Sequence, residues 1–199
     1  MIDVRSPAEF AEDHVPGAVN LPVLDDAQRI EVGTRYKQVS AFEARRLGAG
    51  YVSRNIGTHL AEHFADKPKD YAPLVYCWRG GQRSGAMAHV LERVGWNVHI
   101  LAHGYKTYRR RVRTELQALP RACSFHVLAG FTGTGKTKIL GALAERGEQV
   151  LDLEGLANHQ GSLLGEPPEG QNVGQKLFES RLWNALRRFD PERPVWTEA

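Results

Sequence analysis

The sequence predicts an α/β protein in which parallel strands form the sheets. Short apolar segments of strand length alternate with longer segments of helical apolar spacing, a pattern typical of β–α–β units. The 199 residues leave room for one large domain or two small ones. Pro120 ends a basic helical stretch just before a new apolar strand. We therefore expect two domains, at residues 1–120 and 121–199, with a basic linker helix at the end of the first.

The segments predicted as strands are short and apolar. They are residues 1–4, 74–76, 98–101, 125–129, 150–153 and 195–197. Apolar spacing predicts helices at residues 41–64, 85–94, 115–119, 139–144 and 180–189. Residues 161–174 are rich in glycine and proline, so we expect a loop there. Because the sequence starts and stops within predicted strands, we also expect it to be a fragment of a longer chain.

Composition excludes several classes of protein. The chain is 42% hydrophobic and 25% charged, which is ordinary for a soluble globular protein. No apolar run approaches the ~20 residues that a membrane span needs, and the first residues do not form a signal peptide. The two cysteines, Cys77 and Cys123, cannot make a disulfide framework. We therefore expect a cytoplasmic protein that does not act at a membrane.

The net charge of +3 does not by itself indicate a nucleic-acid-binding protein, but the basic residues are unevenly distributed. One stretch holds a single acid, Glu115, and many bases: Lys106, Arg109, Arg110, Arg111, Arg113 and Arg121. Such a stretch can contact phosphates. A solvated linker helix explains the same pattern equally well.

Cys77 directly follows a predicted strand and precedes a loop that leads into a helix. Backbone N–H groups and a helix N-terminus favour the thiolate, which is the nucleophilic form of cysteine. Arg79 and Arg83 add positive charge, and Gly80 and Gly81 let the backbone curl around an anion. We interpret this segment as a nucleophile in an anion-binding loop, because a buried structural cysteine needs no such surroundings.

The beginning of the chain resembles rhodanese domains. The resemblance rests on Asp3-Val4-Arg5-Ser6-Pro7, on Glu9-Phe10 and on residues 14–22, which read HVPGAVNLP. In that family the cysteine after the central strand carries a persulfide. We expect Asp3, Arg5 and His14 to hold the fold rather than to do chemistry, because they lie at a strand end and a turn.

The spacing after Cys77 departs from ordinary sulfurtransferases, which place the loop arginine five positions after the cysteine. Here Arg83 is six positions away, a C-x5-R spacing similar to that of cysteine phosphatases. The wider loop allows two chemistries: hydrolysis of a phosphate ester, or abstraction of sulfur or selenium from a phosphate-bound donor. A phosphatase also needs a general acid, and no Asp or Glu occurs within the loop.

Residues 130–137, GFTGTGKT, match the complete G-x-x-x-x-G-K-[ST] pattern between a predicted strand and a predicted helix. The loop amides, including those at Gly130, Gly133 and Gly135, are expected to cradle phosphates that Lys136 also reaches. Thr137 is a candidate Mg²⁺ ligand. Asp152, Glu154 and Glu198 are candidate acidic partners for the metal, with Glu198 favoured if its strand neighbours the first strand of this domain.

Four stretches resemble the tRNA 2-selenouridine synthases. They are CWRGGQRS from Cys77, HGYKTYRR from His103, GFTGTGKT from Gly130 and DLEGLANHQGS from Asp152. The resemblance implies a rhodanese-like parallel-sheet domain followed by a partial P-loop NTPase-like α/β domain. A cysteine phosphatase or sulfurtransferase domain fused to a P-loop nucleotide-binding domain is the alternative.

The resemblance further implies a selenotransferase with a geranyltransferase step and no tightly bound cofactor. Selenophosphate and geranyl diphosphate are the implied substrates, and wobble 2-thiouridine is converted by way of S-geranyl-2-thiouridine. Cys77 is the implied site of an S-selanylcysteine intermediate, with Arg79 and Arg83 holding the phosphate. From phosphate affinity alone, we expect the P-loop to hold the diphosphate of the prenyl donor.

The implied macromolecular partner is tRNA, bound through its anticodon loop, with a selenophosphate-supplying enzyme as a further partner. Aromatic and basic side chains near the cysteine resemble a surface for a splayed anticodon loop. The candidate tRNA-binding residues are Trp78, Tyr105, Lys106, Arg109, Arg110 and Arg111. Packing is the alternative role for Trp78. Cys123 is expected to be an unreactive core thiol.

Overall fold

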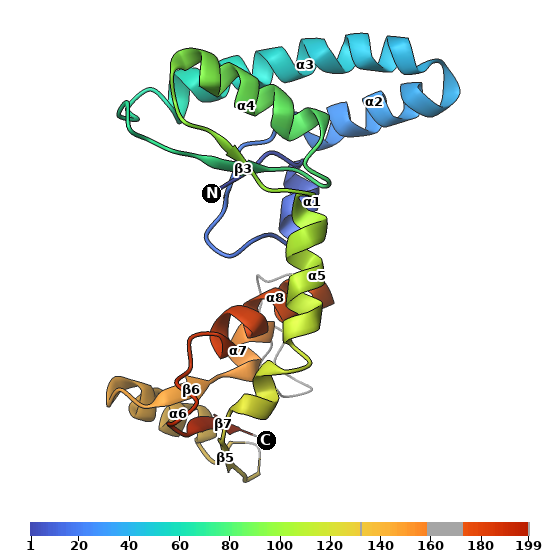
Figure 1. Cartoon of the computed structure of the whole chain (residues 1–199). Helices are drawn as coiled ribbons and strands as arrows, with labels where there is room; N and C mark the ends of the chain where they lie inside the picture. Colours follow the sequence, from blue (N-terminus) through green and yellow to red (C-terminus); the bar gives the residue numbers. More distant parts are fainter. Residues whose placement is uncertain (132, 159–172, 199) are drawn as a thin grey trace. The chain divides into compact units, whose positions relative to one another are not determined.

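The structure is a computed structural model that describes residues 1–131, 133–158 and 173–198 (Figure 1). The predicted loop at 161–174 therefore lies almost wholly outside the described residues. The chain divides into two compact units, Met1–Arg109 and Arg110–Ala199, each with its own parallel sheet. The division falls within a helix, earlier than the boundary expected after Pro120. No helix in the described part of the chain is both long and apolar enough to cross a bilayer.

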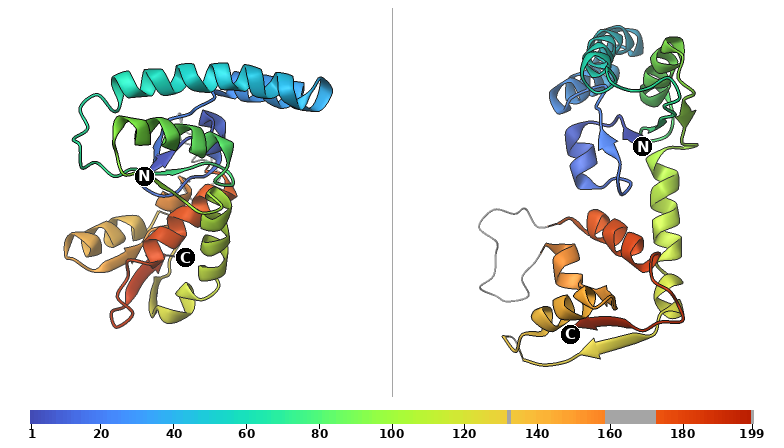
Figure 2. Two further views of the ribbon diagram at one scale, coloured as in Figure 1. Left: turned by 45° about the horizontal axis from the view of Figure 1, so that its top comes forward. Right: turned by 90° about the vertical axis from the view of Figure 1, so that its left-hand side faces the viewer.

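The first unit contains a four-stranded parallel sheet in the order β2-β1-β3-β4. The strands are β1 (Ile2–Asp3), β2 (Val19–Asn20), β3 (Leu74–Tyr76) and β4 (His99–Ile100). The helices are α1 (Pro7–Glu12), α2 (Asp26–Gln38), α3 (Ala41–Glu62) and α4 (Gln82–Val94). α3 and α4 lie over one face of this sheet, and α1 lies on the other side (Figure 1, Figure 2).

The core of this unit lies between the central strands and the helices above them. Val75 from β3 packs with Met87 and Leu91 from α4, and all three side chains are fully buried. Apolar residues on both faces of a strand are typical of parallel sheets that helices cover. This packing fixes the carboxyl end of β3, where Cys77 lies, against the start of α4.

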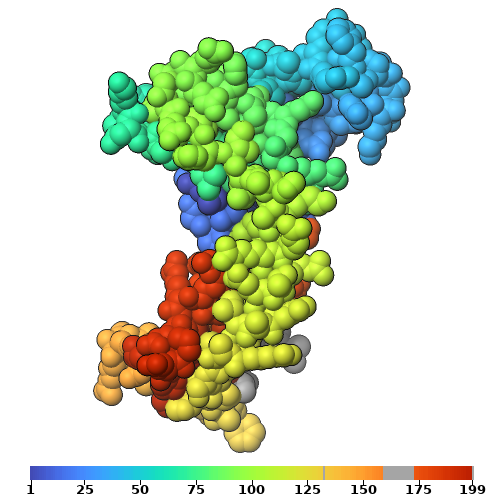
Figure 3. Space-filling model, viewed as in Figure 1, coloured from blue at the N-terminus to red at the C-terminus, as the bar shows by residue number. Residues whose placement is uncertain are grey.

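α2 and α3 form a long antiparallel hairpin that only partly covers the sheet. Asp25 caps α2 by accepting a hydrogen bond from the Gln28 amide, and Ser40 caps α3 by accepting one from the Glu43 amide. Residues 26–50 of this hairpin are drawn in blue to cyan in Figure 3, where their outer side chains lie at the surface. One side of the hairpin faces the start of α4 across a cavity.

The second unit contains a three-stranded parallel sheet in the order β5-β7-β6. Its strands are β5 (Phe125–Leu128), β6 (Gln149–Leu151) and β7 (Val195–Glu198). The helices are α6 (Lys136–Glu145), α7 (Leu153–Ala157) and α8 (Gln175–Leu186), with a short 3-10 helix η1 (Leu119–Ala122) before the sheet. Leu151, Leu186 and Val195 form its buried core.

α5 (Tyr105–Glu115) carries the chain from the first unit into the second. The prediction of a helix at 115–119 is wrong, because α5 ends where that segment begins. Turns and η1 follow instead. Pro120 accounts for the difference, since proline has no N–H to donate and disfavours α conformation in the residue before it.

Candidate functional site

Cys77 lies where strand β3 ends, with the loop 78–81 between it and the first residue of α4. Its side chain is only 4% exposed. The Ser84 hydroxyl, in the first turn of α4, lies 3.3 Å from Cys77 Sγ. The expected strand–loop–helix context of this cysteine is therefore confirmed.

The surroundings of Cys77 favour its thiolate. Burial alone would raise the pKa of the thiol, because desolvation penalises the charged form. Hydrogen bonds from the Ser84 hydroxyl and from the backbone N–H groups of Ser84, Arg79 and Gly81 outweigh that effect. The net result is a lowered pKa for Cys77, so the loop makes this sulfur a better nucleophile at neutral pH.

Backbone hydrogen bonds from the first residues of α5 support the segment that begins at Cys77. The backbone N–H of Tyr105 donates to the Cys77 carbonyl oxygen at 2.8 Å, and that of Lys106 donates to the Trp78 carbonyl at 3.2 Å. Gly104 has a φ of 58°, and a Cβ there would collide with the Cys77 carbonyl oxygen. Gly104, Tyr105 and Lys106 thus support the cysteine loop.

Arg79 in the loop and Arg83 in the first turn of α4 differ in their surroundings. Arg79 is exposed, whereas the guanidinium of Arg83 forms a bidentate ion pair with Glu9 of α1, with Nη2 3.2 Å from Oε1. Burial raises the pKa of Glu9, but the Arg83 guanidinium and the Ser6 amide lower it by more. Glu9 is therefore ionised and fixes the orientation of Arg83. That Arg79 and Arg83 hold a phosphate stays a prediction.

Asp3 and Arg5 form a buried ion pair with no exposed surface on either side chain. Arg5 Nη2 lies 2.6 Å from Asp3 Oδ2, and the guanidinium packs over the Tyr105 ring at 4.1 Å. His14 stacks on Phe10 with ring centroids 3.8 Å apart. These contacts support the expectation that the opening signature holds the fold.

Two of the candidate tRNA-binding residues are mostly buried. Tyr105 is only 3% exposed and donates a hydrogen bond to Asp13 Oδ2 at 2.7 Å, so its ring belongs to the core. Its inclusion among the candidate tRNA-binding residues is corrected, because a buried ring has no face open to a base. The Arg109 side chain is 15% exposed and lies 3.7 Å from the Asp13 carboxylate. Its guanidinium is therefore engaged inside the first unit.

The remaining candidates have more exposed surface. Trp78 is half-buried, with its ring 5.1 Å from that of Tyr105, which agrees with a packing role. Arg111 pairs with Glu115 at 2.7 Å, although its side chain is 60% exposed. Lys106 and Arg110 are exposed on α5. Among the six candidates, Lys106 and Arg110 have the geometry most suited to reaching a phosphate.

The second candidate site is the phosphate-binding loop between β5 and α6. Gly133 and Gly135 both have a φ of 85°, and α6 begins at Lys136. The Lys136 ammonium donates to the carbonyl oxygen of Gly130 at 2.7 Å. The predicted strand–loop–helix arrangement is confirmed for the described residues, and Thr132 lies outside them.

Thr137 and Glu198 come together at the ends of α6 and β7. The Thr137 hydroxyl oxygen is 3.4 Å from both carboxylate oxygens of Glu198. β7 pairs with β5, which confirms the neighbouring strands expected for this acid. Asp152 instead caps α7 by accepting a hydrogen bond from the Gly155 amide at 2.8 Å, so its carboxylate has a structural use.

Across the described ranges, no three His, Cys, Asp or Glu side chains gather as a metal site. A hydroxyl and one carboxylate, as at Thr137 and Glu198, fit a Mg²⁺ ion that takes its other ligands from phosphate and water. Mg²⁺ there would neutralise phosphate charge. Burial raises the pKa of the Cys123 thiol, which agrees with an unreactive role.

Sequence reasoning missed two residues that shape the cysteine site. Ser84 was visible within the motif, but its distance to Cys77 Sγ depends on the turn into α4. Glu9 belongs to the opening signature, and only the fold brings it to Arg83, 74 positions away. The motif Ser-Pro-x-Glu does signal the capping box that starts α1, in which Glu9 returns to the Ser6 amide.

Family models match both units. Residues 1–111 match the model of the rhodanese-like domain, which covers more than half of the chain. Residues 123–198 match the model described as the tRNA 2-selenouridine synthase AAA domain. The chain belongs to the rhodanese-like domain family, and its second unit is similar to the AAA domain of tRNA 2-selenouridine synthases. The rhodanese-like and P-loop fold classes expected from sequence are thereby confirmed.

Curated tRNA 2-selenouridine synthases share more than a third of their aligned residues with the chain. The tRNA 2-selenouridine synthase of Pseudomonas fluorescens is 39% identical over 92% of this chain and 49% of its own length. That of Verminephrobacter eiseniae is 40% identical over 92% and 49%, respectively. That of Marinobacter nauticus is 36% identical over 100% and 53%. The chain thus spans about half the length of the curated relatives it matches.

A solved structure also resembles part of the chain. The crystal structure of an N-terminal domain from Clostridium difficile 630 is 38% identical in sequence, with a TM-score of 0.48. It covers 56% of this chain, and the chain covers 86% of that domain.

Proposed function

We propose that the protein replaces sulfur by selenium in the wobble 2-thiouridine of tRNA. Selenophosphate is the selenium donor, and S-geranyl-2-thiouridine, made from geranyl diphosphate, is the intermediate. The observation that carries the proposal is the ionisable sulfur of Cys77, held by Ser84 and loop amides in a rhodanese-like domain. The family membership of both domains supports it, because the relatives are named for this product.

In the first step, the thiouridine sulfur attacks C1 of the prenyl chain. The C1–O bond breaks with its electron pair going to diphosphate, and the N3 proton of the base is released. Alkylation matters because a thiolate carrying a geranyl group leaves C2 readily, whereas the sulfur of a thiocarbonyl does not. The enzyme must therefore bind an apolar chain and a strongly anionic leaving group together.

In the second step, the Cys77 thiolate attacks the selenium of selenophosphate. The Se–P bond breaks and its electron pair stays with phosphorus, so selenium reaches Cys77 at the oxidation level of a persulfide sulfur. Selenium then bonds to C2 as geranyl thiolate leaves. Cellular thiols supply the two electrons that cleave the remaining S–Se bond. Arg79 and the loop amides stabilise the oxyanion of the donor.

The phosphorus product tests this role of Cys77. The relay through an S-selanyl group releases phosphite, which phosphorus NMR resolves from phosphate. Release of phosphate alone would show that selenophosphate attacks C2 directly, with water later cleaving the Se–P bond. In that case Cys77 would position the donor instead of carrying selenium.

The test of the whole proposal is nucleoside analysis by mass spectrometry. tRNA is prepared from a deletion strain complemented with the full-length gene, with the Cys77→Ser variant or with Cys123→Ser. We expect 2-selenouridine with the wild type and with Cys123→Ser, and its loss with Cys77→Ser. A complemented strain without 2-selenouridine would overturn the proposal.

The C-x5-R spacing keeps phosphatase and sulfurtransferase chemistry open to direct assay. The purified protein is tested with an aryl phosphate and with thiosulfate plus cyanide. Strong turnover of either substrate would contradict selenium transfer as the main activity. Weak turnover of the aryl phosphate is expected, because no Asp or Glu lies between Cys77 and Arg83 to protonate the leaving group.

tRNA is the proposed macromolecular substrate, and an enzyme that makes selenophosphate is the proposed supplier. Selenophosphate is oxidised readily, so direct delivery or a high local concentration favours turnover. We place the protein in the cytoplasm, where tRNA is found and where Cys77 stays reduced.

A further inference from the structure

The first unit contains a cavity of about 710 Å³ between the α2–α3 hairpin and the start of α4. Its size falls within the range of about 300–1,000 Å³ that small-molecule sites occupy. Gln82, Arg83 and Ala86 form the wall contributed by α4. Because Gln82 directly follows the loop 78–81, the cavity adjoins the Cys77 loop.

The α2–α3 hairpin contributes an apolar wall to this cavity. Leu24 precedes α2, Val32 lies on α2, Val52 lies on α3, and small residues of α3 leave the space between them open. The small residues are Ala44, Gly48 and Ala49. A Cβ added at Gly48 would lie 3.4 Å from a Val32 methyl group, so the two helices are closely spaced there. The surface is suited to an apolar chain rather than to a nucleotide base or a sugar.

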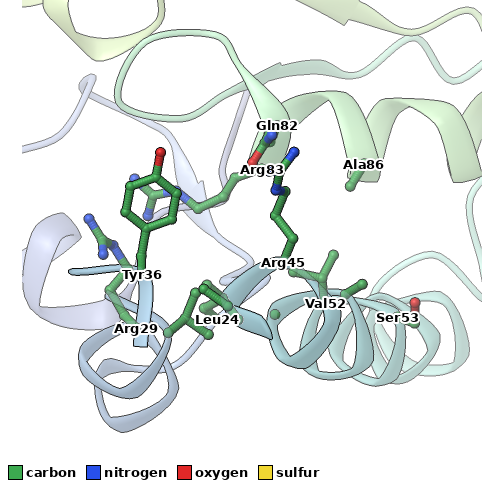
Figure 4. A pocket seen from close by; sticks show the side chains of 13 residues that line it. Leu24, Arg29, Tyr36, Arg45, Val52, Ser53, Gln82, Arg83 and Ala86 are labelled. Carbon is green, nitrogen blue, oxygen red and sulfur yellow. The ribbon is translucent and has the colours of Figure 1, made fainter. Parts of the chain in front are cut away.

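Positive charge lies beside this apolar wall. Arg29, Arg45 and Arg83 all line the cavity, and Figure 4 shows Arg45 extending from α3 toward Gln82 and Arg83 on α4. Glu9 pairs with Arg83 and lies 4.0 Å from Arg29. Three cations against one carboxylate leave the rim positive. Such a site complements an amphiphile with a short apolar body and an anionic head group.

We propose that this cavity seats the prenyl chain of the donor, with its diphosphate against the arginines at the rim. The inference rests on the proposed function, which requires a prenyl diphosphate. It also revises the expectation, drawn from phosphate affinity, that the P-loop holds the donor. The P-loop is left with a separate phosphate-bearing ligand.

Because the cavity adjoins the Cys77 loop, geranylation and selenium transfer can take place at one site. A chain anchored between α2 and α3 places C1 beside the rim, where the thiouridine sulfur forms its bond as the C1–O bond breaks. Diphosphate takes the electron pair and leaves past the arginines. The geranyl group, now on sulfur, stays in the cavity next to the Cys77 loop. The base therefore stays in place while selenium displaces geranyl thiolate.

The first test is chain-length selectivity of the full-length protein with 2-thiouridine tRNA. Ala49→Trp fills the cavity and should lower kcat/KM for geranyl diphosphate at least tenfold while largely retaining use of the five-carbon dimethylallyl diphosphate. Ala61→Trp is the matched control, because Ala61 is exposed on α3 outside the cavity lining. A merely destabilised protein would lose both donors equally, and circular dichroism checks the fold of each variant.

The second test addresses the rim. Arg45→Met should raise the KM for geranyl diphosphate at least tenfold, whereas Arg46→Met should leave it unchanged. Arg46 is the neighbouring residue on the same helix, and it pairs with Glu43 instead of lining the cavity. Equal effects of the two substitutions would overturn the assignment of Arg45 to the diphosphate.

Photolabelling separates failure of this inference from failure of the proposed function. A geranyl diphosphate analogue carrying a benzophenone should label peptides from residues 24–53 or 82–86. Geranylation by the wild type with label confined to residues 130–137 would overturn the cavity assignment and leave the function standing. Label in the cavity without any geranylated tRNA would support the site and contradict the reaction. Neither label nor product would overturn both.

Discussion

The Ser84 hydroxyl oxygen lies 3.3 Å from the sulfur of Cys77, and it is also 3.2 Å from the Gly81 carbonyl oxygen. A hydroxyl has one hydrogen, so it can donate to only one of these acceptors at a time. When Cys77 is a thiolate, the charged sulfur is the stronger acceptor. Ser84 thus responds to the ionisation of Cys77 and stabilises the anion.

Removing that hydroxyl should make Cys77 harder to ionise. In Ser84→Ala the desolvation of the buried thiol remains while one donor to the thiolate is lost, so the pKa of Cys77 rises. The rate of alkylation by iodoacetamide, measured against pH in a Cys123→Ser background, should shift to higher pH. Ser84→Thr keeps the hydroxyl and should behave as the wild type. An unchanged profile for Ser84→Ala would show that the loop amides suffice.

The Glu9–Arg83 ion pair should make stability depend on pH in the acid range. The pKa of Glu9 is lowered in the folded protein, so its contribution is fully present above the unfolded value and is lost as pH falls through the folded one. Glu9→Gln leaves the Arg83 guanidinium without its partner and should cost about 1–3 kcal/mol of unfolding free energy at neutral pH. The difference from the wild type should shrink below about pH 4.

Urea unfolding at pH 7 and at pH 3.5 measures this difference. Glu62→Gln, an exposed glutamate at the end of α3, is the control and should cost little at either pH. A deficit of Glu9→Gln that stays constant across this pH range would show that the carboxylate charge is not what stabilises Arg83.

The parts of the fold that the sequence predicted are those with strong local signals. β3 and β5 are apolar segments beside recognisable loops, and both were found at nearly their observed bounds. α2 was missed because it has no buried residue, so its apolar positions form no continuous stripe. β2 was missed because a strand of two residues is too short to show an alternation of apolar and polar positions. Its strand partner, β1, fixes it by hydrogen bonds that only the fold provides.

The candidate sites divide in the same way. Cys77 and the P-loop were predicted because the residues that define each motif are consecutive in the sequence. The cavity was not predicted, because its walls come from three separate helices whose spacing depends on side-chain packing. Tyr105 was assigned to tRNA from its basic neighbours, and its burial against Arg5 and Asp13 could not be read from that pattern.

Glu198 should matter for Mg²⁺ and not for phosphate itself. Its carboxylate lies 3.4 Å from the Thr137 hydroxyl, where one Mg²⁺ ion can contact both residues directly or through water. Glu198→Gln should abolish most of the gain in nucleotide affinity that Mg²⁺ provides, with little change in EDTA. Titrations with fluorescent ATP and GTP analogues measure both conditions. Thr137→Ala combined with Glu198→Gln should cost less than the sum of the two single effects.

Glu145→Gln is the control for that experiment, since Glu145 is exposed at the far end of α6. A Mg²⁺ response that survives Glu198→Gln would move the metal away from this pair. Equal losses with and without Mg²⁺ would instead indicate that Glu198 supports the loop structurally.

The exposed cations of α5 should contribute to tRNA affinity through phosphate contacts. Lys106 and Arg110 are exposed, whereas Arg109 is held at Asp13, so the first two should account for most of the effect. Each phosphate contact that a substitution removes should reduce the magnitude of the slope of log K against log salt concentration by roughly 0.7–0.9. Lys106→Glu and Arg110→Glu should therefore weaken binding and flatten this slope, as filter binding over a KCl series measures. Arg54→Glu, which makes the same charge change on α3, should not. Equal effects of all three variants would show that only net charge matters, and α5 would then be no specific tRNA surface.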